Sequence, residues 1–83
     1  MPVFKATVTV RLKNGVLDPQ GKAIEGALGS LGFDGVESIR QGKVFDVEVE
    51  ATDSSNAERM LADMAEKLLA NTVIEDFAIK VEG

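Results

Sequence analysis

The residues of this sequence with the greatest capacity for chemistry are three carboxylates in one predicted strand. Asp46, Glu48 and Glu50 alternate with apolar residues, so they share one face of the strand at a spacing of roughly 7 Å. Such a row offers oxygen ligands of the kind that Mg²⁺ prefers, or a general acid–base pair. Basic residues are predicted on the same face: Lys5, Arg11 and Lys80. We therefore favour a solvated, charge-matched surface over a catalytic or metal-binding site.

Several residue types that carry chemistry elsewhere do not occur in these 83 residues. Without Cys, the sequence has no disulfide, thiolate nucleophile or zinc–thiolate site. Without His, Tyr and Trp, it lacks the commonest general base and the usual platforms for stacking nucleotide bases. Its net charge of −5 repels phosphate backbones. We therefore expect a chain that is not an enzyme in its own right, binds no cofactor or metal and does not bind nucleic acid.

The elements that position these residues begin with a strand and a helix. Residues 4–13 alternate apolar and polar side chains, which is the period of a half-buried strand. The pair Asp18-Pro19 predicts a helix start, because Asp can cap free N–H groups and Pro suits the first helical position. Gly32 is predicted to end that helix in the left-handed conformation.

An apolar stripe on this first helix predicts that the helix covers a sheet. The stripe consists of Ile24, Ala27, Leu28 and Leu31. Gly26 and Gly29 lie in the same helix, and each costs roughly 1 kcal/mol there relative to Ala. We expect a close approach between helix and sheet to explain these two glycines.

A β-hairpin is predicted next, with strands over residues 36–40 and 43–51. Gln41-Gly42 is the expected tight turn, with Gly42 at positive φ. In this register Val36 pairs with Val47, and Ser38 pairs with Phe45. The same register sets Ile39 against Val44 on the outer face, as an apolar pair among charged residues.

The last two predicted elements are a helix and a strand. Ser55-Asn56-Ala57-Glu58 has the pattern of a capping box. The buried stripe of the helix is predicted to contain Ala57, Met60, Leu61, Met64, Ala65 and Leu68. Residues 73–81 form the predicted final strand, and the side chains expected to point inward are Phe77, Ile79 and Val81.

The resulting order is β-α-β-β-α-β, which predicts a ferredoxin-like α+β sandwich in a single domain over residues 1–83. Two helices with one apolar stripe each are expected on the same face of a four-stranded antiparallel sheet. No run of apolar residues approaches the roughly 20 needed for a membrane helix, and we find no signal peptide. We therefore expect a cytoplasmic protein that does not contact membranes.

Three stretches of the sequence resemble the PurS family, the small subunit of phosphoribosylformylglycinamidine synthase. The first is Val16-Leu17-Asp18-Pro19-Gln20-Gly21, at the start of the first predicted helix. The second is Arg40-Gln41-Gly42-Lys43, at the predicted hairpin turn. The third is the run from Lys67 to Phe77, Lys-Leu-Leu-Ala-Asn-Thr-Val-Ile-Glu-Asp-Phe. With the matching length and element order, the resemblance covers the whole chain.

The resemblance implies a role in de novo purine biosynthesis. The enzyme of that family uses ATP and glutamine to convert formylglycinamide ribonucleotide into the amidine. A large synthetase subunit carries the ligase chemistry with ATP and Mg²⁺, and a second subunit hydrolyses glutamine. Members of the PurS family bring these two subunits together, usually as a homodimer, and support ammonia transfer between them.

Several residues are candidates for contact with such partners. Arg40, Gln41, Gly42 and Lys43 form the predicted exposed turn. Asn71 and Thr72 join the second helix to the last strand at one end of the sheet. The predicted outer-face pair, Ile39 and Val44, is a candidate for a homodimer or partner interface, because exposed apolar patches on small domains are often interaction sites.

Two other functions remain open from the sequence. A ferredoxin-like sensor domain that binds amino acids would dimerise and bind its ligand at strand–helix loops, here Asn14-Gly15 or residues 32–35. A free-standing enzyme would use Asp46, Glu48 and Glu50. Ligand binding by the isolated chain would distinguish the first, because a ligand of the native state raises its stability. Turnover by the isolated chain would distinguish the second.

Overall fold

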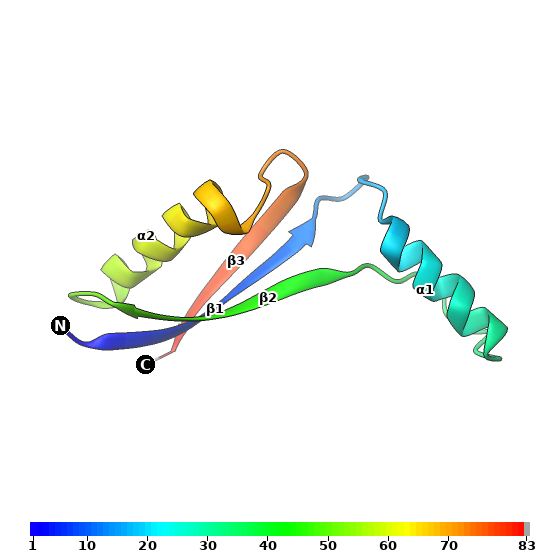
Figure 1. Ribbon diagram of the computed structural model, residues 1–83, viewed down its shortest axis with the longest axis horizontal. Helices are drawn as coiled ribbons and strands as arrows, with labels where there is room; N and C mark the ends of the chain where they lie inside the picture. Colours follow the sequence, from blue (N-terminus) through cyan, green and yellow to red (C-terminus); the bar gives the residue numbers. More distant parts are fainter. Residues whose placement is uncertain (83) are drawn as a thin grey trace.

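A computed structural model describes residues 1–82 of the chain (Figure 1). Its strands are β1 (Val3–Leu12), β2 (Gly42–Glu50) and β3 (Glu75–Glu82), and its helices are α1 (Pro19–Ser30) and α2 (Ser54–Met64). A π-helical turn, η1 (Ala65–Leu69), extends α2. The strands form one antiparallel sheet in the order β2-β1-β3. This is an α+β fold with three strands, not the predicted four.

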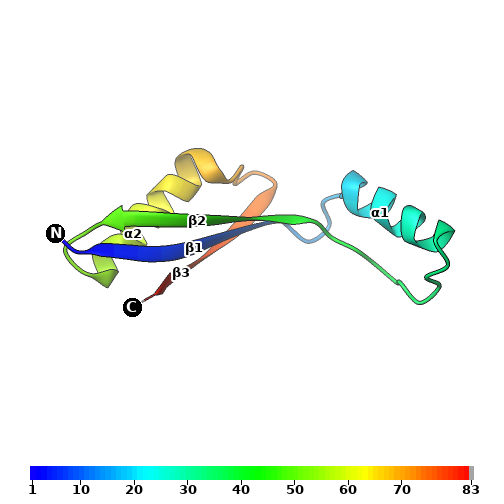
Figure 2. The ribbon, with the colours of Figure 1, turned by 60° about the horizontal axis from the view of Figure 1, so that its bottom comes forward.

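The two helices occupy different places relative to the sheet. α2 lies across one face of the sheet, whereas α1 projects beyond its end (Figures 1 and 2). The molecule therefore measures 52 × 25 × 14 Å, and its radius of gyration is 16.4 Å. A compact chain of this length would have a radius of gyration of about 12 Å. The prediction that both helices cover the same sheet is wrong for this single chain.

The predicted hairpin is also wrong. Residues 33–41 run straight into β2 without pairing to another strand, and φ at Gly42 is not positive. β2 pairs with β1 instead, so that Val47 lies opposite Ala6 and Val44 lies opposite Thr9. The predicted pairs of Val36 with Val47, Ser38 with Phe45 and Ile39 with Val44 therefore do not form. Residues 39–41 are held along α1 by hydrogen bonds, and folding back into a hairpin would break these bonds.

The core lies between β1 and α2. Val8, Val10 and Leu61 are fully buried there. The inward residues predicted for the last strand, Phe77, Ile79 and Val81, pack against this core, which confirms their orientation. β3 begins at Glu75 and not at residue 73, because residues 71–75 form a hydrogen-bonded turn.

The helix α2 confirms most of its predicted stripe and corrects one position. Ala57, Leu61 and Ala65 are fully buried. In η1 the Ala70 N–H donates to Ala65 O at 2.8 Å, a bond that spans five residues and adds one residue to the turn. The added residue rotates Leu68 outward, where it is 84% exposed. Leu69 packs on the core in its place.

The helix ends follow the sequence in part. Asp18 caps α1 with Pro19 in its first turn, and Gly32 follows the helix at φ +97°, as predicted. The cap of α2 is Asp53 instead of the predicted Ser55, and its side chain accepts from Asn56 N at 2.7 Å. No close contact explains the helical glycines Gly26 and Gly29, since a Cβ at either position would meet no described atom within 4 Å.

Candidate partner interface

The three stretches that resemble one family meet at one end of the sheet. They line a groove of about 310 Å³ between the start of α1, the start of β2 and the start of β3. We call it the hinge groove, because it lies where α1 leaves the sheet. It is lined by Leu12, Asp18, Pro19, Gln20, Gln41, Gly42, Lys43 and Glu75. Residues separated by more than fifty positions in the sequence are therefore neighbours here.

Asp18 fixes the position of α1 relative to β2. Its carboxylate accepts from Gly21 N at 2.9 Å, which caps α1, and from Gln41 N at 2.7 Å, which holds the segment leading into β2. The side chain is only 7% exposed. The Gly21 hydrogen bond, followed by the Gln41 bond, holds the pKa of Asp18 below its ordinary value. Asp18 is thus a charged link between two segments and not merely a helix cap.

Gly21 allows the close approach of these segments. Its Cα faces the Ile39 carbonyl oxygen so closely that a Cβ would overlap that oxygen and crowd the Asp18 carboxylate. Gly42 is restricted in the same way, because a Cβ there would lie 2.8 Å from Val10 O. The sequence predicted a turn glycine at position 42, whereas the structure requires glycine for close packing of β2 on β1.

Arg40 and Lys43 are engaged within the chain, although both side chains are exposed. The guanidinium of Arg40 donates to Lys13 O at 3.0 Å and to Val16 O at 3.3 Å, and so fastens the β1–α1 connection. The Lys43 ammonium lies 3.8 Å from a carboxylate oxygen of Glu75 on β3. Arg40 and Lys43 thus hold together the segments around the hinge groove, and their side chains remain accessible to a partner.

Asn71 and Thr72 lie in the turn that precedes β3. The carbonyl oxygen of Asn71 accepts from Ile74 N at 3.0 Å and from Glu75 N at 2.7 Å, and its own N–H donates to the Glu75 carboxylate at 2.7 Å. Asn71 therefore builds the turn that brings Glu75 to Lys43. Both Asn71 and Thr72 are exposed beside the hinge groove.

The predicted apolar pair of Ile39 and Val44 is split between two places. Ile39 is half-buried along α1, and its N–H donates to Glu25 Oε2 at 3.2 Å. Val44 lies opposite Thr9 on the outer face of the sheet and is 63% exposed. No apolar patch is made by these two residues together.

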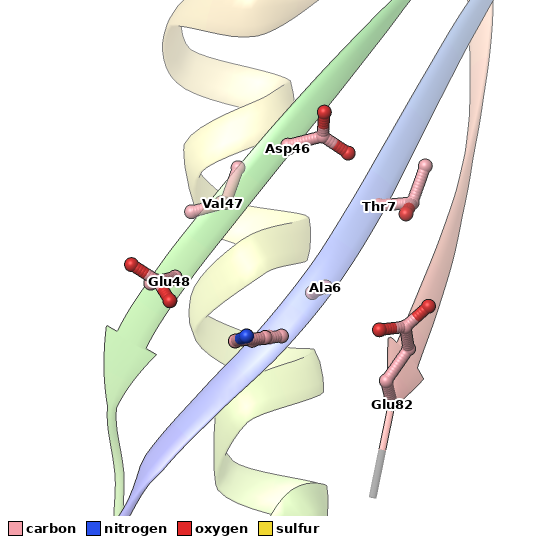
Figure 3. A pocket seen from close by; sticks show the side chains of 7 residues that line it. Ala6, Thr7, Asp46, Val47, Glu48 and Glu82 are labelled. Atoms are coloured by element: carbon pink, nitrogen blue, oxygen red, sulfur yellow. The ribbon is translucent and has the colours of Figure 1, made fainter.

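The carboxylate row lies on the outer face of the sheet, away from α2 (Figure 3). Asp46 faces Thr7 across the β1–β2 pair, while Lys5 lies between Glu48 on one side and Glu82 on the other. These charged side chains are exposed to solvent. Within residues 1–82, no cluster of acidic residues has an arrangement suited to a metal ion.

Sequence reasoning missed the contacts that Asp18 and Gly21 make with residues 39–41. It also missed the contacts that Glu75 makes with Lys43 and Asn71. Each residue had a complete local explanation, as a cap, a helix residue or a strand residue. The Gly-containing start of α1 was the one available signal, because glycine in the first turn of a helix suggests a close neighbour.

Across residues 1–82, neither the length nor the apolar character of any helix is sufficient for a membrane span.

Comparison with known proteins gives one consistent match. A family model described as PurS, phosphoribosylformylglycinamidine (FGAM) synthase, matches residues 5–83. The sequence is 51% identical over 79 residues to the phosphoribosylformylglycinamidine synthase subunit PurS of Mycobacterium leprae, covering 95% of this chain and 96% of that protein. It is 44% identical over 80 residues to the same subunit of Bacillus subtilis, covering 96% and 94%.

Solved structures match in three dimensions as well. The TM-score is 0.88 to Bacillus subtilis PurS, at 44% identity and with 96% of this chain and 99% of that chain covered. It is 0.89 to a chain of PurLQS from Thermotoga maritima, at 33% identity and with 99% and 100% covered. Scores this high over nearly the whole chain require α1 to lie in a similar place, so the displaced α1 is shared with these chains.

Proposed function

Because this chain belongs to the PurS family of phosphoribosylformylglycinamidine synthase subunits, we propose that it is a non-catalytic subunit joining a synthetase and a glutaminase. The reaction is the conversion of formylglycinamide ribonucleotide to the amidine with ATP and glutamine. The observation that carries the proposal is the full-length match, in both sequence and placement of α1, to a chain of PurLQS from Thermotoga maritima.

The residues of the chain support a connecting role. With no Cys or His, it has neither the nucleophile nor the usual base for glutamine hydrolysis. ATP and Mg²⁺ are assigned to the large subunit, and this chain itself holds no cofactor. Its contribution is the end of the sheet at the hinge groove, where the Asp18 carboxylate holds the Gln41 N–H and the Lys43 ammonium lies 3.8 Å from Glu75. The side chains of Gln41, Lys43 and Thr72 are exposed there. A preorganised surface of this kind lowers the entropic cost of binding a partner.

The connecting role follows from the chemistry of the coupled reaction. Ammonia released at the glutaminase must reach the synthetase before it escapes into the cytoplasm, where we place the complex. A small subunit that fixes the two active sites relative to each other shortens that path and closes its sides. Such a subunit needs complementary surfaces and stability, and it needs no catalytic groups.

The test measures amidine formation by the two larger subunits with and without this chain, using either glutamine or ammonium as the nitrogen donor. We expect the glutamine-dependent rate to require the chain and the ammonium-dependent rate to be independent of it. If neither rate responds, the coupling role is refuted. An increase in thermal stability of the isolated chain with amino acids would then favour the sensor function.

A further inference from the structure

Two arginines line one small pocket where β1 ends. The pocket has a volume of about 190 Å³ and is lined by Arg11, Leu12, Asn14, Arg40 and Gln41. We call it the arginine pocket. It adjoins the hinge groove, with which it shares Leu12 and Gln41. Every polar side chain that lines it can donate hydrogen bonds, and none of them is a carboxylate.

The guanidinium of Arg40 is held in a fixed orientation at this pocket. Its Nη2 atom donates to three backbone carbonyl oxygens, which are Lys13 O at 3.0 Å, Val16 O at 3.3 Å and Leu12 O at 3.5 Å. All three bonds use the same nitrogen atom, so the N–H groups on Nη1 and Nε are left over. Because a guanidinium is planar, fixing one nitrogen also fixes the directions of the others. Arg40 therefore presents oriented donors before any ligand arrives.

Arg11 reaches the same pocket across Gly42. The two residues lie opposite each other in the β1–β2 pair, and a Cβ at Gly42 would lie 3.2 Å from Arg11 Cγ. The stem of Arg11 thus occupies the space beside the glycine, where a larger side chain would obstruct it. Its guanidinium is exposed to solvent.

Neither arginine has an acidic partner within residues 1–82. All four ion pairs of this part of the chain use lysines, which are Lys13, Lys22, Lys43 and Lys67. Asp76 lies opposite Arg11 on β3, but Lys13 binds it at 3.0 Å. The Asp18 carboxylate already accepts two backbone N–H groups. Two positive charges at one pocket repel each other, and an anion between them would remove this repulsion.

We propose that the arginine pocket receives one carboxylate side chain, an Asp or a Glu, from one of the two larger subunits. This inference rests on the proposed connecting role and names a contact through which the chain holds a partner. A carboxylate accepts paired N–H bonds from a guanidinium, and such charge-assisted pairs are stronger than neutral hydrogen bonds. The side-chain amides of Asn14 and Gln41 can donate to its remaining lone pairs.

The surroundings favour a carboxylate of a partner over a free phosphate. The chain carries a net charge of −5, and the repulsion that this charge exerts on a dianion is greater than on a monoanion. The pocket is also continuous with the hinge groove, so an acidic side chain of a subunit seated in that groove reaches it directly. Arginine is among the residues that contribute most to binding at protein interfaces.

The first test measures how much of the chain is needed to half-saturate the glutamine-dependent rate of the two larger subunits. Arg11→Gln removes one charge and should raise this concentration at least about tenfold, with less dependence on salt and an unchanged maximal rate. Arg11→Lys keeps the charge without the fork and should recover only part of the loss. The control, Arg59→Gln, removes the same charge from α2, which begins at the other end of the sheet (Figure 1), and should behave as wild type.

The outcomes separate this inference from the connecting role. If the wild-type chain has no effect on the rate at any concentration, the connecting role itself fails. If the wild-type chain saturates the rate and Arg11→Gln does so at the same concentration, only the arginine pocket is refuted. Equal losses for Arg11→Gln and Arg59→Gln would also refute it, since they would show an effect of net charge alone.

The second test locates the carboxylate by cross-linking. A carbodiimide activates a carboxylate, an amine then attacks it to form an amide, and the carbodiimide leaves as a urea. In the assembled complex, Arg11→Lys should yield a peptide that joins position 11 to one Asp or Glu of a larger subunit, detected by mass spectrometry. Arg59→Lys should yield no such product at position 59. A product joining position 11 to an acid of this chain or of a second copy, or no product at position 11, would overturn the proposal.

Discussion

The sheet with α2 and the arm, which we define as residues 13–41 with α1, are held in place by different interactions. In the first region, apolar side chains from β1, α2 and η1 form a closed core in which Val8, Val10 and Leu61 are fully buried. In the arm, only Asp18 and Gly21 are buried, and the contacts that fix it are hydrogen bonds. Burial stabilises the first region without directional requirements, whereas the arm depends on a few atoms in a fixed geometry.

This difference teaches where the stability and the assembly of the molecule reside. An arm held by a polar link keeps its shape while leaving its apolar face uncovered, which is the state expected of a surface that is buried on association. Three sets of variants would break or sharpen this comparison, beginning with the largest expected effect.

The largest effect is expected from Leu61→Ala in the core. Removing a fully buried leucine side chain leaves a cavity and should lower the free energy of unfolding by about 2–5 kcal/mol. The control is Leu68→Ala. Leu68 lies in η1, which extends α2, and is 84% exposed. It should change the free energy of unfolding by no more than about 0.5 kcal/mol. Urea unfolding measures the free energy of unfolding of both variants. Comparable losses would contradict the outward position of Leu68 that η1 produces.

A smaller effect is expected from alanine at two glycines of α1. The Cβ of Gly21→Ala would overlap Ile39 O, and the resulting shift should cost about 1–3 kcal/mol. Gly26→Ala adds a methyl group where no described atom lies within 4 Å, so it should stabilise the helix by up to about 1 kcal/mol. Thermal unfolding of both variants measures these opposite signs. If Gly26→Ala were instead destabilising, the open space that the structure shows on that side of α1 would be contradicted.

The smallest effect is expected from Asp18, and it depends on pH. Its hydrogen bonds to Gly21 and Gln41 lower its folded-state pKa. Its stabilisation is therefore complete above the unfolded pKa of about 4 and is lost as the pH falls through the lower folded value. Asp18→Asn keeps one side-chain oxygen as an acceptor, but its NH₂ group would face one of the two backbone N–H donors, Gly21 N or Gln41 N. Hydrogen exchange of the Gln41 backbone amide should therefore accelerate at neutral pH.

The control for this variant is Asp53→Asn, since Asp53 caps α2 through a single bond to Asn56 N. It should leave exchange at Gln41 unchanged. Unfolding measured between about pH 5 and pH 2 should show a smaller acid-dependent loss for Asp18→Asn than for the wild-type chain. Identical pH profiles would show that the Asp18 carboxylate does not hold the arm.

The sequence by itself determined most local structure. Strict alternation in β1, Asp18-Pro19 before α1, Gly32 after it and the stripe of α2 each predicted the observed element, because these signals act within one strand or one turn. The family was also evident in the sequence, since its three stretches retain their types and spacing. Leu68 was misplaced, because no local pattern distinguishes an α-helical turn from the π-helical η1.

Only the tertiary structure decided the direction of the chain at Gln41-Gly42. These two residues fit a tight turn and a straight strand equally well, and a local preference for either is small. The straight path is set by Asp18 binding Gln41 N and by Arg40 binding Lys13 O, contacts that span 23 and 27 residues. Local periodicity does not encode such contacts. The fourth strand and the second helix over the sheet, both predicted from the sequence, are therefore absent from residues 1–82, where the sheet has three strands.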